Sequence, residues 1–142
     1  MAILTHFRTI RTWPLPLAIG IVIGGMGLQL VQAQAPGPKS TRLLQADLTG
    51  VPGKEVFMTI IDVQPGAGFP AHFYDGDEFV FVIEGSYERF VEQMQTVAKP
   101  GEGFHIEREK IHGGKAGGTA PTKLLTVHIV DKGKPLVERV KQ

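Results

Sequence analysis

The chain contains no cysteine among its 142 residues. It therefore has no disulfide bonds, no thiolate nucleophile and no cysteine-ligated zinc. It also lacks an excess of either charge, since Lys and Arg number 15 and Asp and Glu number 14. Two of the basic residues, Arg8 and Arg11, lie near the start, so the rest of the chain is close to neutral. No basic patch indicates a nucleic-acid partner.

Sustained helical periodicity is absent after residue 40, and no solenoid-type repeat is present. Short runs rich in β-branched and aromatic residues recur instead, separated by Gly- and Pro-containing turns. Many short strands at regular spacing predict an all-β sandwich or barrel. The expected strands are 55–63, 69–74, 78–83, 87–92, 96–99, 104–107 and 123–130, and 42–48 is either an edge strand or an irregular arm.

The first third of the chain has the layout of a secretory signal peptide. Arg8 and Arg11 precede an apolar run over about 15–30, and small residues follow it. Val31 and Ala33 suit the two positions read at cleavage, which predicts a signal peptide over 1–33. An uncleaved membrane anchor is the alternative, but the apolar run is shorter than the ~20 residues of a spanning helix. We expect a periplasmic or secreted protein that contacts the membrane only through this segment, if it stays uncleaved.

The remaining residues are enough for one domain of ordinary size. The Pro- and Gly-containing stretch 34–40 predicts a flexible linker. The expected strands place a single β-barrel domain over 41–135, and 136–142 form a polar C-terminal tail.

Three potential metal ligands fall within seven residues: His72, Tyr74 and Glu78. His72 and Tyr74 lie two apart in an expected strand and so share a face. A turn over 75–77 allows Glu78 to return to that face. His112, in a second Gly-rich segment, is a further candidate. Imidazole and carboxylate are suitable ligands for Fe, Mn, Ni, Cu or Zn.

The spacing of these residues resembles the first motif of the cupin superfamily, whose members are small double-stranded β-helix (jelly-roll) barrels. That motif is Gly, five residues, His-x-His, three or four residues, Glu, six residues, Gly. Here the corresponding positions are Gly66, His72, Tyr74, Glu78 and Gly85, with every spacing kept. Tyr74 stands where the second His is expected.

The second cupin motif is kept in part. It is Gly, five residues, Pro-x-Gly, two residues, His, three residues, Asn. His112 keeps its place after Gly101, whereas Glu107, Glu109 and Ala116 stand where Pro, Gly and Asn are expected. The resemblance is greatest to small single-domain cupins of the conserved-barrel type.

This resemblance implies an all-β jelly-roll barrel and a site for a divalent transition metal. Carried over residue by residue, the family's ligands are His72, Glu78 and His112. Three alternatives stay open for Tyr74. It lies near the metal or binds weakly, it ligates a strongly Lewis-acidic ion such as ferric iron as phenolate, or the metal is lost and the barrel binds a small molecule without it.

The resemblance also implies a function. Dioxygenases, isomerases, decarboxylases and epimerases occur among cupins, and in such an enzyme Tyr74 would be a catalytic proton donor to a small-molecule substrate. The alternatives are a non-catalytic small-molecule-binding cupin and an interaction domain with a vestigial motif. Cupins often form dimers, which implies a homodimer. Phe79, Phe81 and Ile83 share one strand face that suits burial against the second sheet or another subunit.

Three further residues belong to no motif position. We expect His105 and His128 to have packing or surface roles, although His128 would line the cavity if its strand face turned inward. Arg89 alternates with Tyr87 on one strand. Turned into the barrel it would bind a substrate carboxylate bidentately, but we expect it on the outer surface.

Overall fold

A computed structural model describes residues 36–140 of this protein. The signal peptide predicted over 1–33 lies outside the described residues. Between residues 36 and 140, no helix is long and apolar enough to cross a membrane.

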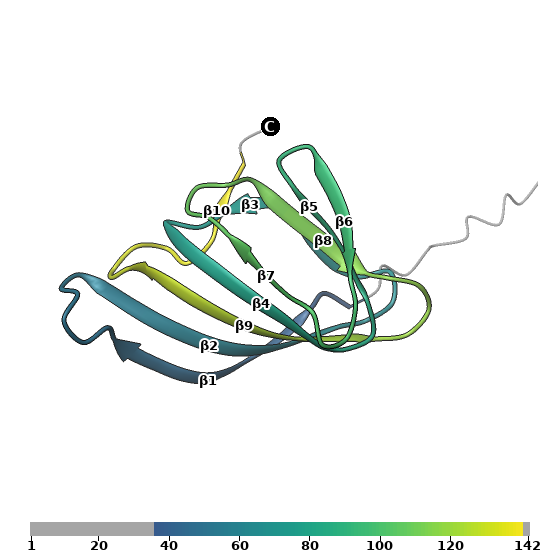
Figure 1. Cartoon of the computed structure of the whole chain (residues 1–142), viewed down its shortest axis with the longest axis horizontal. Coiled ribbons are helices and arrows are strands. Elements are labelled where there is room, and N and C mark those ends of the chain that lie inside the picture. Colours follow the sequence, from purple (N-terminus) through teal and green to yellow (C-terminus); the bar gives the residue numbers. More distant parts are fainter. Residues whose placement is uncertain (1–35, 141–142) are drawn as a thin grey trace, which may run out of the picture. The chain divides into compact units, whose positions relative to one another are not determined.

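Ten strands form two five-stranded sheets in the described part of the chain (Figure 1). Sheet A has the strand order β1-β2-β9-β4-β7, and sheet B has the order β10-β3-β8-β5-β6. Every pairing of neighbouring strands is antiparallel. The strands are β1 (Lys39–Asp47), β2 (Lys54–Val63), β3 (Gly68–Phe73), β4 (Gly76–Glu84), β5 (Tyr87–Val91), β6 (Met94–Ala98), β7 (Gly103–Ile106), β8 (His112–Ala116), β9 (Thr122–Asp131) and β10 (Glu138–Arg139). The predicted all-β jelly-roll fold is confirmed.

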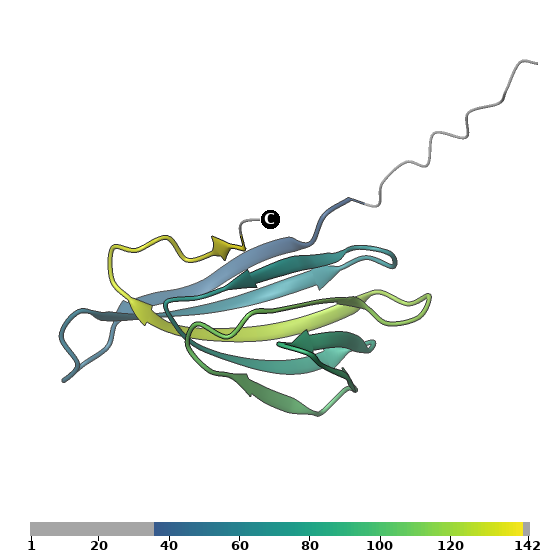
Figure 2. The same cartoon turned by 90° about the horizontal axis from the view of Figure 1, so that it is seen from above.

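Strand structure extends slightly past the bounds expected from sequence. β1 begins at Lys39, inside the stretch 34–40 expected to be a linker, and β10 lies in the expected tail. β1 is exposed along its whole length and pairs only with β2, so it is an edge strand and not an irregular arm. Figure 2 shows the same chain from above, with β1 in blue and the C-terminal segment in yellow.

The long strands of sheet A alternate between a buried and a partly exposed face. Along β2 and β9 every second residue is buried, as expected for strands that place one face on a core. Near one end of the barrel these inward residues are apolar. That core contains Ile61, Val63, Ala67, Val80, Val82, Tyr87, Ala98, Ala116 and Leu124, with Phe69 and Phe104 packed against it.

Further along the same strands the inward residues become polar. Thr59, Glu78, Thr126 and His128 are all buried there. Burying polar groups costs free energy unless they find partners, so this end of the barrel interior is the natural location of a site.

The glycines of the two motifs sit at turns with left-handed backbone. Gly66, Gly85 and Gly101 have φ of 79°, 72° and 87°. A residue with a Cβ adopts this conformation only with strain. The motif glycines therefore mark the positions at which the chain turns between strands.

Candidate functional site

Two rows of side chains, one from each sheet, meet inside the barrel and form the candidate site. In sheet A, Glu78 on β4 lies directly opposite His128 on β9. In sheet B, His72 on β3 lies directly opposite His112 on β8. All four side chains are buried, and the His72 and His112 rings lie 4.2 Å apart between centroids. The fold therefore brings together the three ligands predicted from sequence and adds His128.

Glu78 is the centre of this group. Its Oε2 lies 3.2 Å from His112 Nε2, and its Oε1 lies 3.3 Å from His128 Nε2. Both distances are short enough for ion pairs. The angles do not fit hydrogen bonds, however, and both histidine Nε2 atoms are buried without a hydrogen-bond partner.

Backbone carbonyls orient two of the imidazole rings. His72 Nδ1 lies 2.8 Å from Pro70 O, and His112 Nδ1 lies 2.8 Å from Lys110 O. A carbonyl only accepts, so each Nδ1 carries the proton, and in the neutral ring Nε2 has a free lone pair. The same arrangement orients metal-binding histidines in proteins generally.

Tyr74 places its hydroxyl against His72. The phenol oxygen lies 3.0 Å from His72 Nε2, and the Tyr74 ring packs edge-on against His128 at 4.6 Å between centroids. Burial, together with the negative charge of Glu78, raises the pKa of Tyr74 well above its usual value. In this structure Tyr74 is thus an O–H donor to His72.

Ionisation inside the cluster follows from burial and neighbouring charge. Burial acts to raise the pKa of Glu78, but His112 and His128 hold that pKa below its usual value whenever their Nε2 atoms carry a proton. Burial lowers the pKa of His72. The group at pH 7 is therefore a carboxylate facing imidazole nitrogens.

The imidazole and carboxylate donors are of the kind that bind a transition-metal ion, although their positions in this structure do not enclose a complete metal site. Two ligand atoms each ~2.1 Å from one ion, at angles of about 90–109°, are separated by about 3.0–3.4 Å. The contacts of Glu78 with His112 and His128 have this separation. In residues 36–140, no group of three or more His, Asp or Glu is arranged to hold a metal ion as it stands. One reason lies in the contacts: His72 turns its free nitrogen to Tyr74.

Two expectations about individual residues are wrong. His128 has neither a surface nor a plain packing role, because β9 turns the face with Thr126 and His128 inward and brings His128 to Glu78. Arg89 is not on the outer surface, since its guanidinium carbon lies 3.9 Å over the Phe104 ring and its Nε is buried. The alternation of Leu124, Thr126 and His128 was the only sequence signal for His128, and it did not tell which face was inside.

His105 behaves as expected. It is exposed, its Nε2 lies 2.8 Å from Asp77 Oδ1, and its ring stacks on Phe79. It is outside the site and shares no contact with the cluster around Glu78.

An open cavity leads to the cluster. Its volume is about 720 Å³, and it is lined by Thr59, His72, Tyr74 and His128 together with residues of β1 and the C-terminal segment, including Arg42, Val137 and Arg139. A small inner space of about 20 Å³ continues from it past His72 and Tyr74 and is lined also by Glu78, Tyr87, Arg89 and His112. A small molecule therefore has a route to the imidazole and carboxylate groups.

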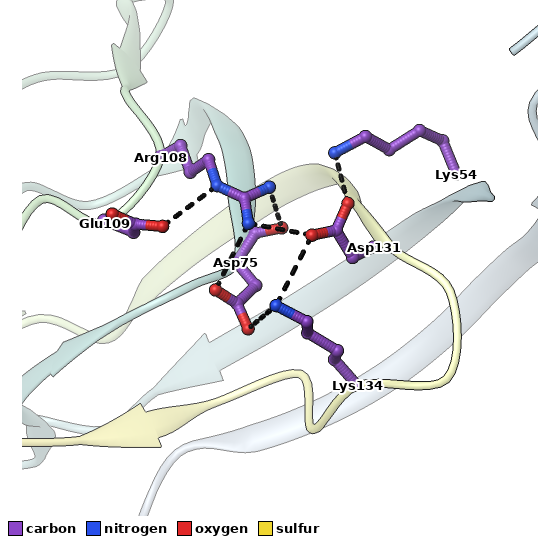
Figure 3. Close-up of polar contacts among 6 residues, drawn as sticks. All are labelled: Lys54, Asp75, Arg108, Glu109, Asp131 and Lys134. Atoms are coloured by element: carbon purple, nitrogen blue, oxygen red, sulfur yellow. Dashed lines mark hydrogen bonds and ion pairs between the residues drawn. The ribbon is translucent and has the colours of Figure 1, made fainter.

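Ion pairs fix the two loops that carry Tyr74 and precede His112 (Figure 3). Arg108 donates to Asp75 O at 3.0 Å and to Asp131 Oδ2 at 2.8 Å. The Glu109 N–H donates to Tyr74 O at 3.0 Å. Lys134 reaches Asp75 Oδ2 at 3.1 Å. The turn after Tyr74 is thereby tied to the loop before β8 and to the end of β9.

Comparison with known proteins agrees with this geometry. The family model described as "Cupin domain" matches residues 59–128, a range that contains all four clustered side chains and Tyr74. The chain belongs to the cupin superfamily. A search of curated proteins gave no match.

Solved cupin structures share the fold. A protein with a double-stranded β-helix domain from Klebsiella pneumoniae is similar at a TM-score of 0.62 and 18% identity, over 78% of this chain and 86% of that one. A cupin superfamily protein from Desulfitobacterium hafniense is similar at 0.58 and 20%, over 86% and 94%. KdgF from a Halomonas species is similar at 0.55 and 17%, over 68% and 83%. At these identities the likeness concerns the fold.

Proposed function

We propose that this cupin binds a divalent transition metal through His72, Glu78, His112 and His128 and acts as a metal-dependent enzyme on a small molecule. One observation carries the proposal: the free nitrogens of two buried histidines face both oxygens of one buried carboxylate without making hydrogen bonds. Such nitrogens are costly to leave unpartnered, and a cation between them and the carboxylate satisfies both.

The chemistry is oxygenase or isomerase chemistry. A divalent ion held by His72, Glu78, His112 and His128 would polarise a substrate oxygen or activate dioxygen. The chain's own contribution is Tyr74, whose hydroxyl keeps its proton and lies beside the cluster at the opening of the cavity. It donates that proton, or a hydrogen bond, to an oxygen of the bound molecule.

A specific observation favours a second candidate. Tyr74 already occupies His72 Nε2, and a cupin that keeps this contact has one ligand fewer for a metal. In that case the protein is a non-catalytic barrel that holds a small molecule in the 720 Å³ cavity.

Elemental analysis of the purified protein separates the two candidates. We expect near-stoichiometric Fe, Mn, Ni, Cu or Zn in the wild type and a large loss in the isosteric variant Glu78→Gln. His105→Gln is the matched control, because it removes an exposed imidazole outside the site. If the wild type stays metal-free after incubation with each of these ions, the metal-dependent enzyme is excluded and the second candidate, a non-catalytic small-molecule-binding protein, is favoured.

We further propose a homodimer formed through the outer face of sheet A. The outward residues of β2, β9 and β4 are apolar and only partly buried: Val56, Met58, Ile60, Leu125, Val127, Ile129, Phe79, Phe81 and Ile83. Phe79 and Phe81 are 43% and 44% exposed. Monomers rarely expose an apolar patch of more than a few hundred Å².

A second copy of the chain fits this face in size and charge. Four strands of nine or ten residues and one of four, at ~4.8 Å spacing, cover roughly 700 Å², close to the ~800 Å² that each partner gives to a standard interface. The apolar residues end at Lys54 and Asp131 on one side and at Asp62 and Lys123 on the other. Each end carries both charge signs, so the face is complementary to a copy related by a two-fold axis.

The order of basic, apolar and small residues in the sequence of 1–33 supports export of the protein to the periplasm or the medium. The small-molecule substrate is then one found in that compartment.

A further inference from the structure

Arg89 is a cation inside the barrel without a counter-charge. Its Nε is buried and makes no hydrogen bond, and within residues 36–140 no carboxylate lies within ion-pair distance of it. Its guanidinium rests on the Phe104 ring instead. The side chain as a whole is half-buried, so the guanidinium keeps part of its contact with water and is free to bind an anion.

Strand register places Arg89 beside the metal-binding group. On the inward face of sheet B, Arg89 lies opposite Gly114, and Val91 lies opposite His112. The inward-facing pair that contains Arg89 is therefore next to the pair that contains His112, two residues or about 7 Å further along the strands. Its supporting ring, Phe104, lies opposite Val80, which is one row from Glu78.

Gly114 makes room for the Tyr87 ring beside this pair. A Cβ on Gly114 would lie 2.7 Å from Tyr87 Cζ, so a larger residue would displace the Tyr87 ring, which stacks with the same Phe104 ring that supports Arg89. The residues that border the inner space of about 20 Å³ include Arg89, Tyr87, His72, Glu78 and His112. It has room for about one small group.

We propose that Arg89 binds the carboxylate of a small organic acid, whose neighbouring oxygen then faces the cluster around Glu78. The planar guanidinium forms paired hydrogen bonds with a carboxylate, which a lysine or a neutral side chain does not. The inference rests on the proposed function in taking the cluster as the reacting centre, and it names the substrate class: small carboxylic acids.

Binding to the metal-free protein tests the proposal separately from the metal. Protein stripped with a chelator and desalted is titrated with pyruvate, lactate and succinate, and with the neutral amides pyruvamide and lactamide, by calorimetry and by NMR. We expect at least one acid to bind, its amide to bind at least ~10-fold more weakly, and Arg89→Gln to weaken the acid roughly 10- to 100-fold. Arg89→Lys should be intermediate.

The matched control is Lys99→Gln, which removes an exposed cation that lines neither the outer cavity, the inner space nor the groove beside β6. We expect it to change acid binding less than two-fold. Thermal melting of each variant confirms that it is folded. The ring-proton signals of His72 and His112 should shift on addition of acid in the wild type and not in Arg89→Gln.

Several outcomes would overturn the inference. These are equal binding of acid and amide, unchanged binding in Arg89→Gln, an equal loss in Lys99→Gln, no binding of any of the three acids, or binding that leaves both histidine signals unmoved. The last result would place the acid in the groove of about 600 Å³ that Arg89 also borders, beside Gln95 and Thr96 of β6. If the protein holds no metal but still binds the acid through Arg89, the proposed metal-dependent enzyme is rejected and the proposed acid-binding site stands.

Discussion

Glu78 and His128 lie directly opposite each other on neighbouring strands, with Glu78 Oε1 3.3 Å from His128 Nε2. The same carboxylate faces His112 from the opposite sheet. A third histidine thus enters the site from β9, while Tyr74 stands at the motif position where cupins carry one. If the cluster binds a metal as we propose, His128 would take the place of the histidine that the motif has lost.

Replacing His128 tests this compensation. We expect His128→Gln to lower metal affinity at least ~10-fold, since one of the nitrogens facing Glu78 is removed. Competition with a chromophoric chelator measures the affinity. The control His105→Gln should match the wild type, and an unchanged affinity in His128→Gln would show that His128 is only packed beside the site.

Replacing Tyr74 should act in the opposite direction. Tyr74→His restores the motif imidazole and removes the hydroxyl that occupies His72 Nε2. We expect metal affinity to rise by about 10-fold or more, and to rise less in Tyr74→Phe, which only frees His72. Weaker binding in both variants would mean that the phenol itself holds the ion. Tyr74→Phe should also lose turnover if the hydroxyl donates the proton.

The network in Figure 3 predicts how stability depends on pH. Arg108, and then Lys54, hold the pKa of Asp131 far below its usual value. A carboxyl with a lowered pKa stabilises the fold above the pKa of the unfolded chain, about 3.9, and this stabilisation is lost as the pH falls below it.

We therefore expect the melting temperature to fall between pH 4 and pH 2, and to fall less steeply in Arg108→Gln. Differential scanning calorimetry over that range measures it. Lys115→Gln, which breaks an exposed pair with Glu88, is the control and should follow the wild type. Parallel curves for wild type and Arg108→Gln would contradict the prediction.

A charge on the outer face of sheet A should prevent the proposed dimer from forming. Phe81→Glu puts a carboxylate among the apolar side chains of β9 and β2. Sedimentation velocity should show a dimer for the wild type and a monomer for Phe81→Glu. Met94→Glu, at a 69% exposed position on β6, should remain dimeric. A monomeric wild type would leave the face to another partner or exposed.

Cleavage after Ala33 predicts a mature chain that begins at Gln34. Intact-mass measurement of the protein recovered from the periplasm or medium of an expressing bacterium should give that start. Recovery of the full-length chain in the membrane fraction would support an uncleaved anchor instead.

Local sequence was sufficient for the fold and for most of the candidate site. Alternating apolar residues determine which strands form, and the motif glycines mark turns, because both depend on near neighbours in the chain. His72, Tyr74 and Glu78 lie within seven residues, so their common face follows from strand geometry and one turn. His112 was found by its spacing from Gly101.

Only the tertiary structure decided the roles of His128 and Arg89. Each lies on a strand whose two faces are similar in sequence, and a period of two does not tell which face is inside. That choice depends on the pairing of β9 with β4 and of β5 with β8, which joins residues 50 and about 25 positions apart. Register across the sheets therefore placed a histidine on Glu78 and an unpaired arginine one row from His112.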